Sequence, residues 1–580
     1  MKPYNSSMRP LAFWVLYCSA SAFAAAPADL YQQHCAGCHD FPANPRIPTR
    51  AALGGLPPSA IEKALTSGVM EHQAATLAEP DRAAIANWLG AVDSGARTNL
   101  CETNPTPGSG PALAASNVAG LKLKWAFGFP NATMVRSQPA VWHGRLFTGS
   151  QDGTVYSLNA STGCVYWTTR TGAEIRSAIT IAEGKLLFGD SAGRVSALDI
   201  ETGRQLWQVQ ADPHPATRVT GAPVLWKGRV YVPVSSSEEG VALQPGYVCC
   251  TFRGSVLALD AATGRQLWRS YTIPQPPTQR LTTRRGTTTL GPSGAAVWSS
   301  PTIDAARNAV YVTTGDNYSD PVTETSDALL AFDLDSGKLL WSHQFTKADA
   351  MNLSCWQPGK ANCPDSDGPD FDFGAPPILV GRRLILSQKS GLVYAVDPDR
   401  KGHLLWQTRV AEGGVAGGVQ WGSATDGERV YAAISDMSLR PPAERKPGGP
   451  RYEIDPKKGG GITALRVSDG QRVWLTPPPG CDGRRPCSPA QMAAISVIPG
   501  AVFSGAVDGH IRAYDAADGH ILWDFDTARP FETVNGVPGH GGSIDVAAPV
   551  IAGGMLYVNS GYNFLGGMAG NVLLAFETQP

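Results

Sequence analysis

Two cysteines and a histidine near the amino end have the spacing used for covalent haem attachment. Cys35 and Cys38 are separated by two residues, and His39 follows directly in the sequence CAGCH. Two thiols three positions apart on a turn can add to both vinyl groups of one haem, and the next imidazole can then bind the iron. Zinc is the main alternative, but a structural zinc site needs a fourth ligand at suitable spacing and none follows. The motif therefore predicts a c-type haem.

A methionine further along is the expected second axial ligand of that haem. Met70 lies in the sequence SGVMEHQAATL, 31 residues after His39. A thioether ligand raises the reduction potential of a haem and suits electron transfer, whereas a ligand such as the nearby His72 gives a lower potential. A core methionine without a role as ligand is the other alternative. We predict that Met70 is the ligand.

The residues around these ligands predict a small α-helical cytochrome c domain. The sequence EPDRAAIANWLG reads as a closing helix, with Pro80 near its first turn and Ile85, Trp88 and Leu89 on one face. The domain then covers residues 27–90. So small a unit could scarcely fold without a haem filling its interior.

The amino end itself has the features of a secretion signal. Lys2 and Arg9 precede an apolar stretch of about 14 residues, and the sequence AFAAAP then offers cleavage sites around Ala24 to Ala26. This stretch is shorter than the ~20 residues that span a bilayer, although an uncleaved anchor is the alternative. We therefore predict that residues 1–26 are a signal peptide, that the protein is periplasmic, and that the mature chain has no membrane span.

The cysteine count of an exported chain is informative about disulfides. Removing Cys18 with the signal and the two haem cysteines from the total of eleven leaves eight, an even number. Free buried thiols are the alternative for some of them. Four disulfides are expected, between the pairs Cys249 and Cys250, Cys355 and Cys363, Cys481 and Cys487, and Cys101 and Cys164.

One motif recurs through most of the remaining chain. It is an alternating strand, a turn rich in Asp and Gly, and a second strand that ends in Trp, which together form a hairpin. GSVLALDAATGRQLW, which ends at Trp268, is typical of the seven copies. The copies end at Trp167, Trp207, Trp268, Trp341, Trp406, Trp474 and Trp523.

The two ends of this repeat region supply one further copy between them. GNVLLAFETQP at the carboxyl end stops before any Trp, whereas LKLKWAF near the start offers Trp125 without a first half. A ring needs such a split copy, because pairing the last strands with the first leaves no open sheet edge. The sequence therefore predicts an all-β eight-bladed β-propeller over residues 120–580, joined to the cytochrome domain by a linker at 91–119. An open stack of repeats is the alternative.

Composition and repeat spacing agree with this architecture. The chain has 64 glycines, 46 prolines and only 17% charged residues, which is typical of short strands and many turns. Its formal net charge of −1 gives no electrostatic basis for nucleic-acid binding. A four-stranded blade needs about 40 residues. Four consecutive Trp intervals of 61 to 73 residues therefore contain long loops, where a binding site is usually built.

The repeats and the haem motif resemble a known family. The pattern GxVxALDxxTGxxxW resembles the tryptophan-docking motifs of pyrroloquinoline quinone (PQQ) alcohol dehydrogenases. Eight such blades behind a CxxCH module most closely resemble the cytochrome-containing polyvinyl-alcohol dehydrogenases, over nearly the whole mature chain. Non-catalytic assembly proteins of bacterial envelopes share the repeats without binding quinone, so the long loops must decide between an enzyme and a scaffold.

The resemblance implies a Ca²⁺ site. TGAPVLWKGRVYVPVSSSEEG resembles the family segment whose glutamate binds Ca²⁺, and an ungapped match selects Glu238 over Glu239. In VYVTTGDNYSD, Asp316 falls where the family has its Asn ligand, and Asn317 is adjacent, so either residue could serve. Carboxylate and amide oxygens suit a hard cation. An acidic solvated loop is the alternative.

The resemblance also implies the residues that hold PQQ. The family uses a disulfide between neighbouring cysteines, here Cys249 and Cys250, as a flat lid over the quinone, and Trp298 in GAAVWSSPTID matches the Trp that stacks beneath it. The expected lid lies in a loop between strands, whereas in the methanol dehydrogenases it follows a docking Trp. A buried core Trp is the alternative for Trp298.

Cations and further side chains complete the expected cofactor site. Arg176 in EIRSAITI matches a family arginine, and its planar fork suits the carboxylates of PQQ. Lys389 in SQKSGLVYAVDP matches a lysine that polarises the reactive carbonyls. Thr220 and Trp421 are further expected cofactor contacts. Surface charges are the alternative for the two cations.

The implied reaction is oxidation of an alcohol at PQQ, which Ca²⁺ makes more electrophilic. Asp327 in TSDALLAFD is the expected catalytic base, with Asp320 and Glu324 as alternatives. Electrons then leave through the haem to an external acceptor such as a soluble cytochrome c. Secondary alcohols, including polymeric ones, are the expected substrates. A haem-bearing scaffold without quinone and a PQQ sugar dehydrogenase are the competing hypotheses.

Overall fold

The computed structural model describes residues 27–39, 47–48, 50–53, 56, 58–90, 101, 111–244, 246–442, 452–481 and 483–578. The expected signal peptide lies outside these residues, as does most of the expected linker. None of the helices within them has the length and apolar character needed to cross a bilayer.

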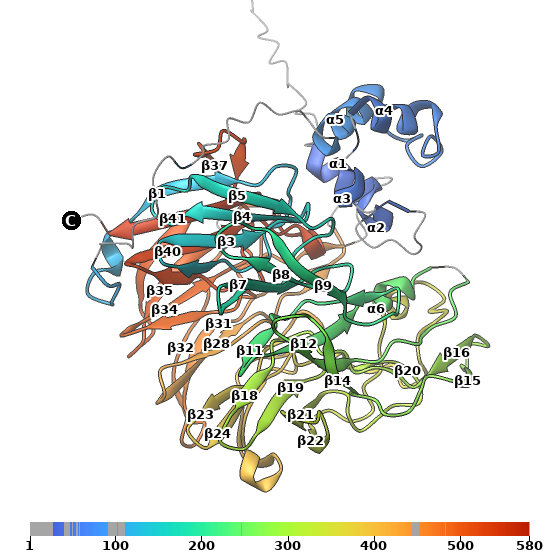
Figure 1. Cartoon of the computed structure of the whole chain (residues 1–580), viewed down its shortest axis with the longest axis vertical. Coiled ribbons are helices and arrows are strands. Elements are labelled where there is room, and N and C mark those ends of the chain that lie inside the picture. The colour runs from blue at the N-terminus through green and yellow to red at the C-terminus, as the bar shows by residue number, and fades with distance from the viewer. Residues whose placement is uncertain are drawn as a thin grey trace, which may run out of the picture.

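A small helical module forms the amino-terminal part of the described chain (Figure 1). Its helices are α1 (Pro27–His34), α2 (Ala36–His39), α3 (Arg50–Leu53), α4 (Pro58–Ser67) and α5 (Glu79–Leu89). The closing helix is confirmed as α5, with Pro80 in its first turn and with Ile85 and Leu89 buried. These two side chains pack with Tyr31 of α1 and Leu65 of α4 in one apolar cluster.

Eight antiparallel sheets make up most of the rest of the described fold, as the repeats predict; seven have four strands, and the third has β10 (Thr217–Arg218) as a fifth. The first four sheets contain β2 (Ala140–Trp142), β3 (Arg145–Gly149), β4 (Thr154–Asn159) and β5 (Val165–Arg170); β6 (Thr180–Ala182), β7 (Lys185–Gly189), β8 (Arg194–Asp199) and β9 (Gln205–Gln210); β11 (Val224–Trp226), β12 (Arg229–Ser236), β13 (Ser255–Asp260) and β14 (Gln266–Tyr271); and β18 (Thr302–Asp304), β19 (Ala309–Thr313), β21 (Ala328–Asp333) and β22 (Leu339–Gln344). The other four contain β23 (Ile378–Val380), β24 (Arg383–Ser387), β25 (Leu392–Asp397) and β26 (His403–Arg409); β27 (Ala424–Thr425), β28 (Arg429–Ile434), β31 (Gly461–Arg466) and β32 (Arg472–Thr476); β33 (Ser496–Ile498), β34 (Ala501–Gly505), β35 (His510–Asp515) and β36 (Ile521–Asp526); and β39 (Val550–Ala552), β40 (Met555–Ser560) and β41 (Val572–Thr578) with β1 (Leu121–Gly128).

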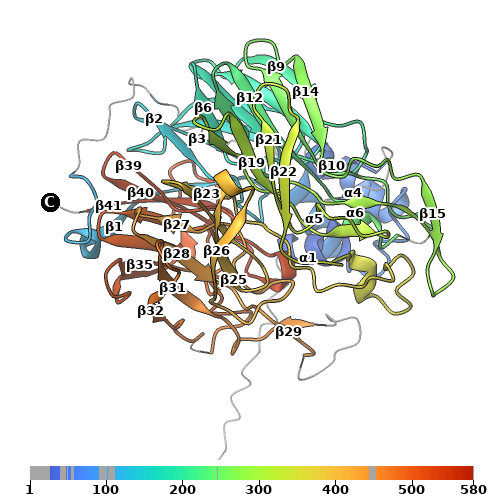
Figure 2. The ribbon, with the colours of Figure 1, turned by 90° about the horizontal axis from the view of Figure 1, so that it is seen from below.

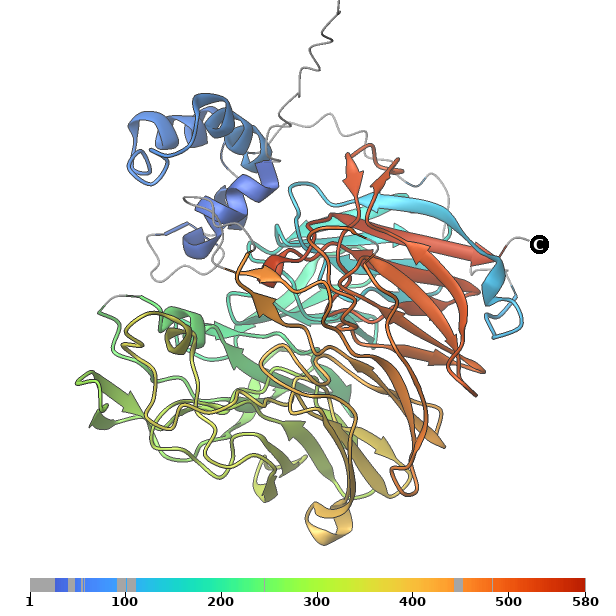
Figure 3. The ribbon, with the colours of Figure 1, turned by 180° about the vertical axis from the view of Figure 1, so that it is seen from behind.

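The eighth sheet closes the ring with strands from both ends of the propeller. β1 pairs with β41, and Trp125 lies opposite Ala575, as Trp268 lies opposite Ala258 in a complete copy. Figure 3 shows β1 beside the strands from the carboxyl end. The split copy predicted from sequence is therefore confirmed, and the open stack is excluded.

The repeated tryptophans join one blade to the next. The Nε1 atom of Trp207 donates a hydrogen bond to Ala261 O at 3.1 Å, in the turn of the following blade. In that turn Gly264 has φ +73°, and a Cβ there would lie 2.8 Å from the Trp207 ring. Glycine is required for both reasons, so the turn and the Trp of neighbouring copies form one unit of blade packing.

The expected long loops carry additional short elements. They are β10 (Thr217–Arg218), α6 (Glu238–Val241), β15 (Gln279–Thr282), β16 (Thr288–Gly291), β17 (Ser293–Gly294), β20 (Asn317–Ser319), η2 (Leu353–Trp356), η3 (Pro398–Arg400), β29 (Leu439–Arg440) and β30 (Glu453–Ile454). The remaining short elements are η1 (Val118–Gly120), β37 (Pro530–Phe531), β38 (Gly539–His540) and η4 (Phe564–Gly566).

All four predicted disulfides are present. They join Cys101 to Cys164, Cys249 to Cys250, Cys355 to Cys363 and Cys481 to Cys487. Cys101 lies in the expected linker, so its disulfide ties that segment to the first blade.

Candidate functional site

The haem motif is arranged as a haem site requires. His39 is only 5% exposed, and its Nδ1 donates a hydrogen bond to Pro48 O at 2.8 Å. This contact leaves Nε2 for a metal, because the proton is fixed on the other ring nitrogen. Neither Cys35 nor Cys38 belongs to a disulfide. Met70 packs against the apolar cluster of the module, whereas His72 is exposed; the assignment of Met70 as the second ligand stays a prediction.

One buried arginine links the helical module to the propeller. Arg50 is 7% exposed and lies over the rings of Tyr31 and Trp88, at 4.6 and 4.5 Å from their centres. Its guanidinium donates hydrogen bonds to Thr133 Oγ1 at 3.2 Å and to Asn131 O at 2.5 Å in the loop after β1. Arg50 therefore fixes the module on the rim of the ring.

A cavity of about 620 Å³ lies between the module and the loops of the propeller. Gly37, inside the CAGCH motif, lines it together with propeller residues from several blades. Among the expected site residues, those in the lining are Arg176, Thr220, Trp298, Asp316, Lys389 and Trp421. The ring thus brings together residues that lie up to about 245 positions apart in the chain.

Three carboxylates in this cavity form a cluster suited to a hard cation. Oxygen atoms of Glu239, Asp316 and Asp372 lie within 4.8 Å of one another. Asp316 is fully buried, and neither of its carboxylate oxygens accepts a hydrogen bond from a described residue. Burial, and then Asp372, raise the pKa of Asp316 well above its usual range. A bound cation would compensate this buried charge, so the residues fit Ca²⁺.

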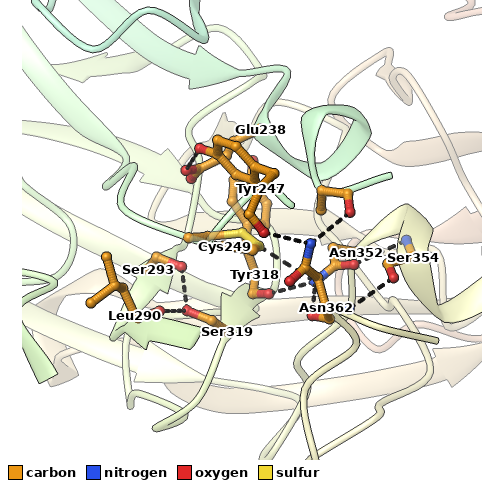
Figure 4. Close-up of a disulfide and its surroundings, with 12 residues drawn as sticks. Glu238, Tyr247, Cys249, Leu290, Ser293, Tyr318, Ser319, Asn352, Ser354 and Asn362 are labelled. Carbon is orange, nitrogen blue, oxygen red and sulfur yellow. Dashed lines mark hydrogen bonds between the residues drawn. A yellow bond between two sulfur atoms is a disulfide. The ribbon is translucent and has the colours of Figure 1, made fainter. Parts of the chain in front are cut away.

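Glu238, the expected ligand, does not line the cavity, whereas its neighbour Glu239 does. Both oxygens of Glu238 are already engaged, because Oε1 accepts hydrogen bonds from Tyr247 Oη at 2.5 Å and Thr251 N at 2.8 Å, and Oε2 accepts one from Phe252 N at 2.8 Å. Figure 4 shows Glu238 directed at Tyr247. Glu238 therefore holds the loop of the vicinal disulfide, and Glu239 faces the cavity.

Asn317, the alternative to Asp316, is also committed elsewhere. Its Oδ1 accepts a hydrogen bond from Thr323 N at 2.8 Å, and its Nδ2 donates one to Ser293 O at 3.0 Å. Of the two adjacent residues, only Asp316 lines the cavity.

Lys389 lies next to the acidic cluster, on the ring of Trp298. Its Nζ donates hydrogen bonds to Asp370 Oδ1 at 2.8 Å and to Asp372 Oδ2 at 2.9 Å, and it lies 5.2 Å from the centre of the Trp298 ring. Burial alone would lower the pKa of Lys389, but Asp370 and Asp372 raise it well above its usual range. The ammonium therefore stays charged at neutral pH.

Asp327, the expected base, lies behind the cavity wall. It is fully buried and is not among the residues that line the cavity. Neither of its oxygens accepts a hydrogen bond from a described residue, and burial, followed by Asp349, raises its pKa well above the usual range. Asp370 lines the cavity instead, beside Lys389. The alternatives Asp320 and Glu324 do not line it either.

The other part of the cavity is cationic. Arg176 and Arg218 line it, and no described carboxylate lies within ion-pair distance of either guanidinium. Burial lowers the pKa of both arginines, that of Arg218 to about 10. Arg136 also lines the cavity and pairs with Glu174. Cavity arginines without a carboxylate partner among the described residues suit an anionic ligand such as a polycarboxylate.

Aromatic rings connect the two charged parts. Arg176 lies 4.8 Å from the centre of the Trp421 ring, and Trp421 meets Trp298 edge to face at 5.1 Å. Thr220 Oγ1 donates a hydrogen bond to Trp298 O at 3.2 Å. The contacts thus run from Arg176 through the two tryptophans to Lys389, which is the arrangement expected around a flat, charged cofactor.

The vicinal disulfide does not form the surface that sequence reasoning expected. Cys249 and Cys250 are fully buried and do not line the cavity. They pack with Tyr318, which does line it, in one apolar cluster (Figure 4). In this structure the disulfide therefore lies behind the cavity wall, and its role as a direct cover of the quinone stays a prediction.

Asp545 gives this site a pH-dependent stability. It accepts a hydrogen bond from Trp421 Nε1, and burial raises its pKa to about 6. The folded protein holds this proton more tightly than the unfolded chain, so its stability decreases as pH rises from about 4 to about 6. Above that window the ionised carboxylate destabilises the fold by roughly 3 kcal/mol.

We therefore expect Asp545→Asn to raise the melting temperature at pH 7.5 by more than at pH 4. The measurement is thermal unfolding of the PQQ-free protein at both pH values, because an anionic cofactor would change the charge near Arg176. A variant that is equally stabilised at both pH values would contradict the assigned pKa.

Sequence reasoning set Glu239 aside in favour of Glu238, and it missed Asp370, Asp372 and Arg218, which also line the cavity. The alternation in GPDFDFGAP is a usable signal, because two aspartates separated by one residue, in a charge-poor chain, face the same side of an extended segment. Arg218 had no comparable local signal.

Two family models match this chain, and two curated relatives align with nearly all of it. The family model of the outer membrane protein assembly factor BamB matches residues 122–284, 252–485 and 458–579, and that of cbb3-type cytochrome c oxidase subunit III matches residues 22–89. Polyvinylalcohol dehydrogenases from a Pseudomonas species and from Sphingopyxis sp. (strain 113P3) are 39% and 38% identical to the chain; each alignment covers 95% of this chain, and 93% and 94% of the respective relative.

A solved structure supports the fold alone. The quinohemoprotein alcohol dehydrogenase from Comamonas testosteroni superposes with a TM-score of 0.56 at 19% identity, over 84% of this chain and 82% of that chain. Because two relatives match nearly from end to end, the chain belongs to the polyvinylalcohol dehydrogenase family, with a propeller built from the repeats of the BamB family model.

Proposed function

We propose that the protein is a periplasmic alcohol dehydrogenase that uses PQQ, Ca²⁺ and haem c and oxidises secondary alcohols, with polyvinyl alcohol or a similar polymer as substrate. The observation that carries the proposal is one cavity that combines arginines, a Trp pair, a lysine and a carboxylate cluster, with Gly37 of the haem motif in its wall. The names of the two similar relatives support the substrate.

Separate groups of cavity residues would hold the two cofactors. Glu239, Asp316 and Asp372 would hold the cation, and Trp298 with the arginines would hold the quinone. When bound, PQQ accepts a hydride from the carbinol carbon, and Ca²⁺ makes its reactive carbonyl more electrophilic. Lys389 donates hydrogen bonds to Asp370 and Asp372 beside this region, and the two carboxylates keep its ammonium charged.

Asp370 is the proposed base that takes the proton of the substrate hydroxyl. It is the carboxylate of the Lys389 pair that does not belong to the cation cluster. It lines the cavity, so a substrate can reach it, which is the first requirement of a general base.

The haem motif adjoins this site, so electrons would travel only a short distance from the quinone to the haem. Gly37 lies between the two cysteines that attach the haem and also lines the cavity. An external acceptor, proposed to be a soluble cytochrome c, would then take them one at a time. Arg50 holds the module in this position.

Arg50→Ala should slow the reduction of the haem by substrate by about tenfold. Hydrogen bonds from a charged group contribute roughly 1.5–3 kcal/mol each, so their loss makes undocked positions of the module accessible. Rapid-mixing absorption of the haem measures this step, and turnover with a dye that accepts electrons directly from the quinone is expected to stay within twofold. Arg82→Ala, in α5, is the matched control; equal rates in both variants would contradict the docking role.

The test of the proposed function is direct. The purified protein is supplied with PQQ and Ca²⁺, and the haem absorption is recorded as secondary alcohols, polyvinyl alcohol and sugars are added. Reduction by alcohols is the expected result. If no alcohol reduces the haem and PQQ does not bind, the protein is a haem-bearing scaffold; reduction by sugars alone would make it a sugar dehydrogenase.

A further inference from the structure

A second cavity opens on the surface beside the proposed catalytic cavity. Its volume is about 690 Å³, and its wall is formed by the loop after α6, the hairpin β15–β16 and the segment after η2. Leu243 and Gln244 line both cavities, so the two are adjacent. Figures 1 and 2 both show the hairpin β15–β16 at the edge of the molecule, where an extended ligand can approach.

The wall of this second cavity is uncharged but rich in hydrogen-bonding groups. None of its described lining residues is Asp, Glu, Lys, Arg or His, in contrast to the catalytic cavity. Thr287, Thr288 and Gln357 contribute polar side chains. A neutral ligand that carries hydroxyl groups would match this wall, whereas a charged ligand would lose its hydration without gaining a partner.

Asn362 provides one buried acceptor in that wall. It is 3% exposed, and its Nδ2 donates hydrogen bonds to Ala242 O and Tyr247 O, both at 2.9 Å. These bonds fix the orientation of the amide, and Oδ1 accepts no hydrogen bond from any described residue. A hydroxyl group of a ligand could satisfy this acceptor.

Apolar side chains line the way between the cavities. Leu243, Val248 and Trp356 are 40%, 44% and 45% exposed, although large apolar residues are usually buried. Leu243 and Trp356 line the catalytic cavity and Val248 lines the second one. The disulfide between Cys355 and Cys363 closes the loop that carries Trp356, so this surface is held in place.

We propose that the second cavity is a distal binding site for the chain of a neutral polymeric alcohol. A backbone of alternating CH₂ and CHOH groups presents both the apolar surface and the hydroxyl groups that this wall accepts. One carbinol then reacts in the catalytic cavity, while the adjoining chain passes over Leu243. The inference rests on the proposed function and names the part of the protein that selects a polymer over a small alcohol.

The experiment compares Gln357→Arg with the matched control Gln266→Arg, an exposed glutamine of β14 that does not line either cavity. The full-length holoprotein oxidises polyvinyl alcohol and pentane-2,4-diol. In Gln357→Arg, kcat/KM for the polymer is expected to fall roughly tenfold, which corresponds to about 1.4 kcal/mol, because the new charge enters a neutral cavity. With the diol it stays within twofold, and the control changes neither substrate.

A second variant and a binding measurement keep the result interpretable. Thr288→Trp fills the same cavity from the hairpin and should show the same selective loss. Calorimetric titration of the PQQ-free protein with polyvinyl alcohol should show weaker binding in both variants. Equal losses for polymer and diol, or unchanged polymer binding, would overturn the distal site. Failure of every alcohol to reduce the haem while polymer binding responds to both variants would instead refute the proposed function alone.

Discussion

Asp370→Asn lowers kcat for alcohol oxidation by about 10³-fold and leaves PQQ bound, which is the expected outcome if Asp370 is the base. General-base catalysis typically contributes 10²–10⁴-fold. In the parent protein, Lys389 Nζ donates a hydrogen bond to Asp370 Oδ1 at 2.8 Å. The Asn side chain keeps an oxygen that can accept this hydrogen bond, so the site should remain folded. The measurement is the rate of haem reduction by a secondary alcohol, together with the PQQ content of the purified variant.

Asp327→Asn is the matched control for this prediction. Asp327 is buried without a hydrogen bond to its oxygens from the described residues, and its φ of +48° suits Asn as well as Asp. The variant removes an uncompensated acidic group, so it should be at least as stable as the parent and retain activity within a few-fold. An inactive Asp327→Asn beside an active Asp370→Asn would restore the assignment made from sequence.

Glu239→Gln should abolish most of the activity through loss of the cation. The change removes one negative charge from the cluster with Asp316 and Asp372. Even residues that only support metal ligands change metal affinity by about 10–100-fold, so loss of a direct ligand should weaken Ca²⁺ binding by at least about 100-fold. Calcium titration by calorimetry, with activity at rising Ca²⁺ concentration, measures the effect.

Glu238→Gln distinguishes the two adjacent glutamates. A Gln amide cannot accept the hydrogen bonds of Tyr247, Thr251 and Phe252 on both of its ends, so one buried donor loses its partner. Such a loss destabilises a protein by roughly 1–3 kcal/mol. The melting temperature should therefore fall, while Ca²⁺ affinity changes by less than threefold. Loss of Ca²⁺ in this variant with normal affinity in Glu239→Gln would contradict the assignment.

The fold was predictable because its information is local and repeated. Each copy carries its own alternating strand, its turn glycine and its Trp, and the contact of Trp207 with Gly264 is made between neighbouring copies. The missing Trp of the last copy and the extra Trp125 sufficed to predict the pairing of β1 with β41. Three disulfides followed from their short separations, and the even count left Cys101 to pair with Cys164, 63 residues away.

Residue type and spacing predicted the haem motif, and the resemblance to the PQQ dehydrogenases indicated several members of the cavity. Lys389, Trp298, Arg176 and Asp316 all reached the same cavity, because each follows a strand whose place in the ring is set by the repeat.

Only the tertiary structure decided which of several similar acidic residues lines the cavity. Glu238 and Glu239 are adjacent at the start of α6, and the choice between them depends on hydrogen bonds from residues 9 to 14 positions further along. Asp327 and Asp370 both lie near Lys389 in the fold, but only one lines the cavity. Local sequence sets where a carboxylate occurs, whereas the direction of its side chain depends on the long loops packed around it. Those loops have no repeat, so their packing cannot be read from the chain.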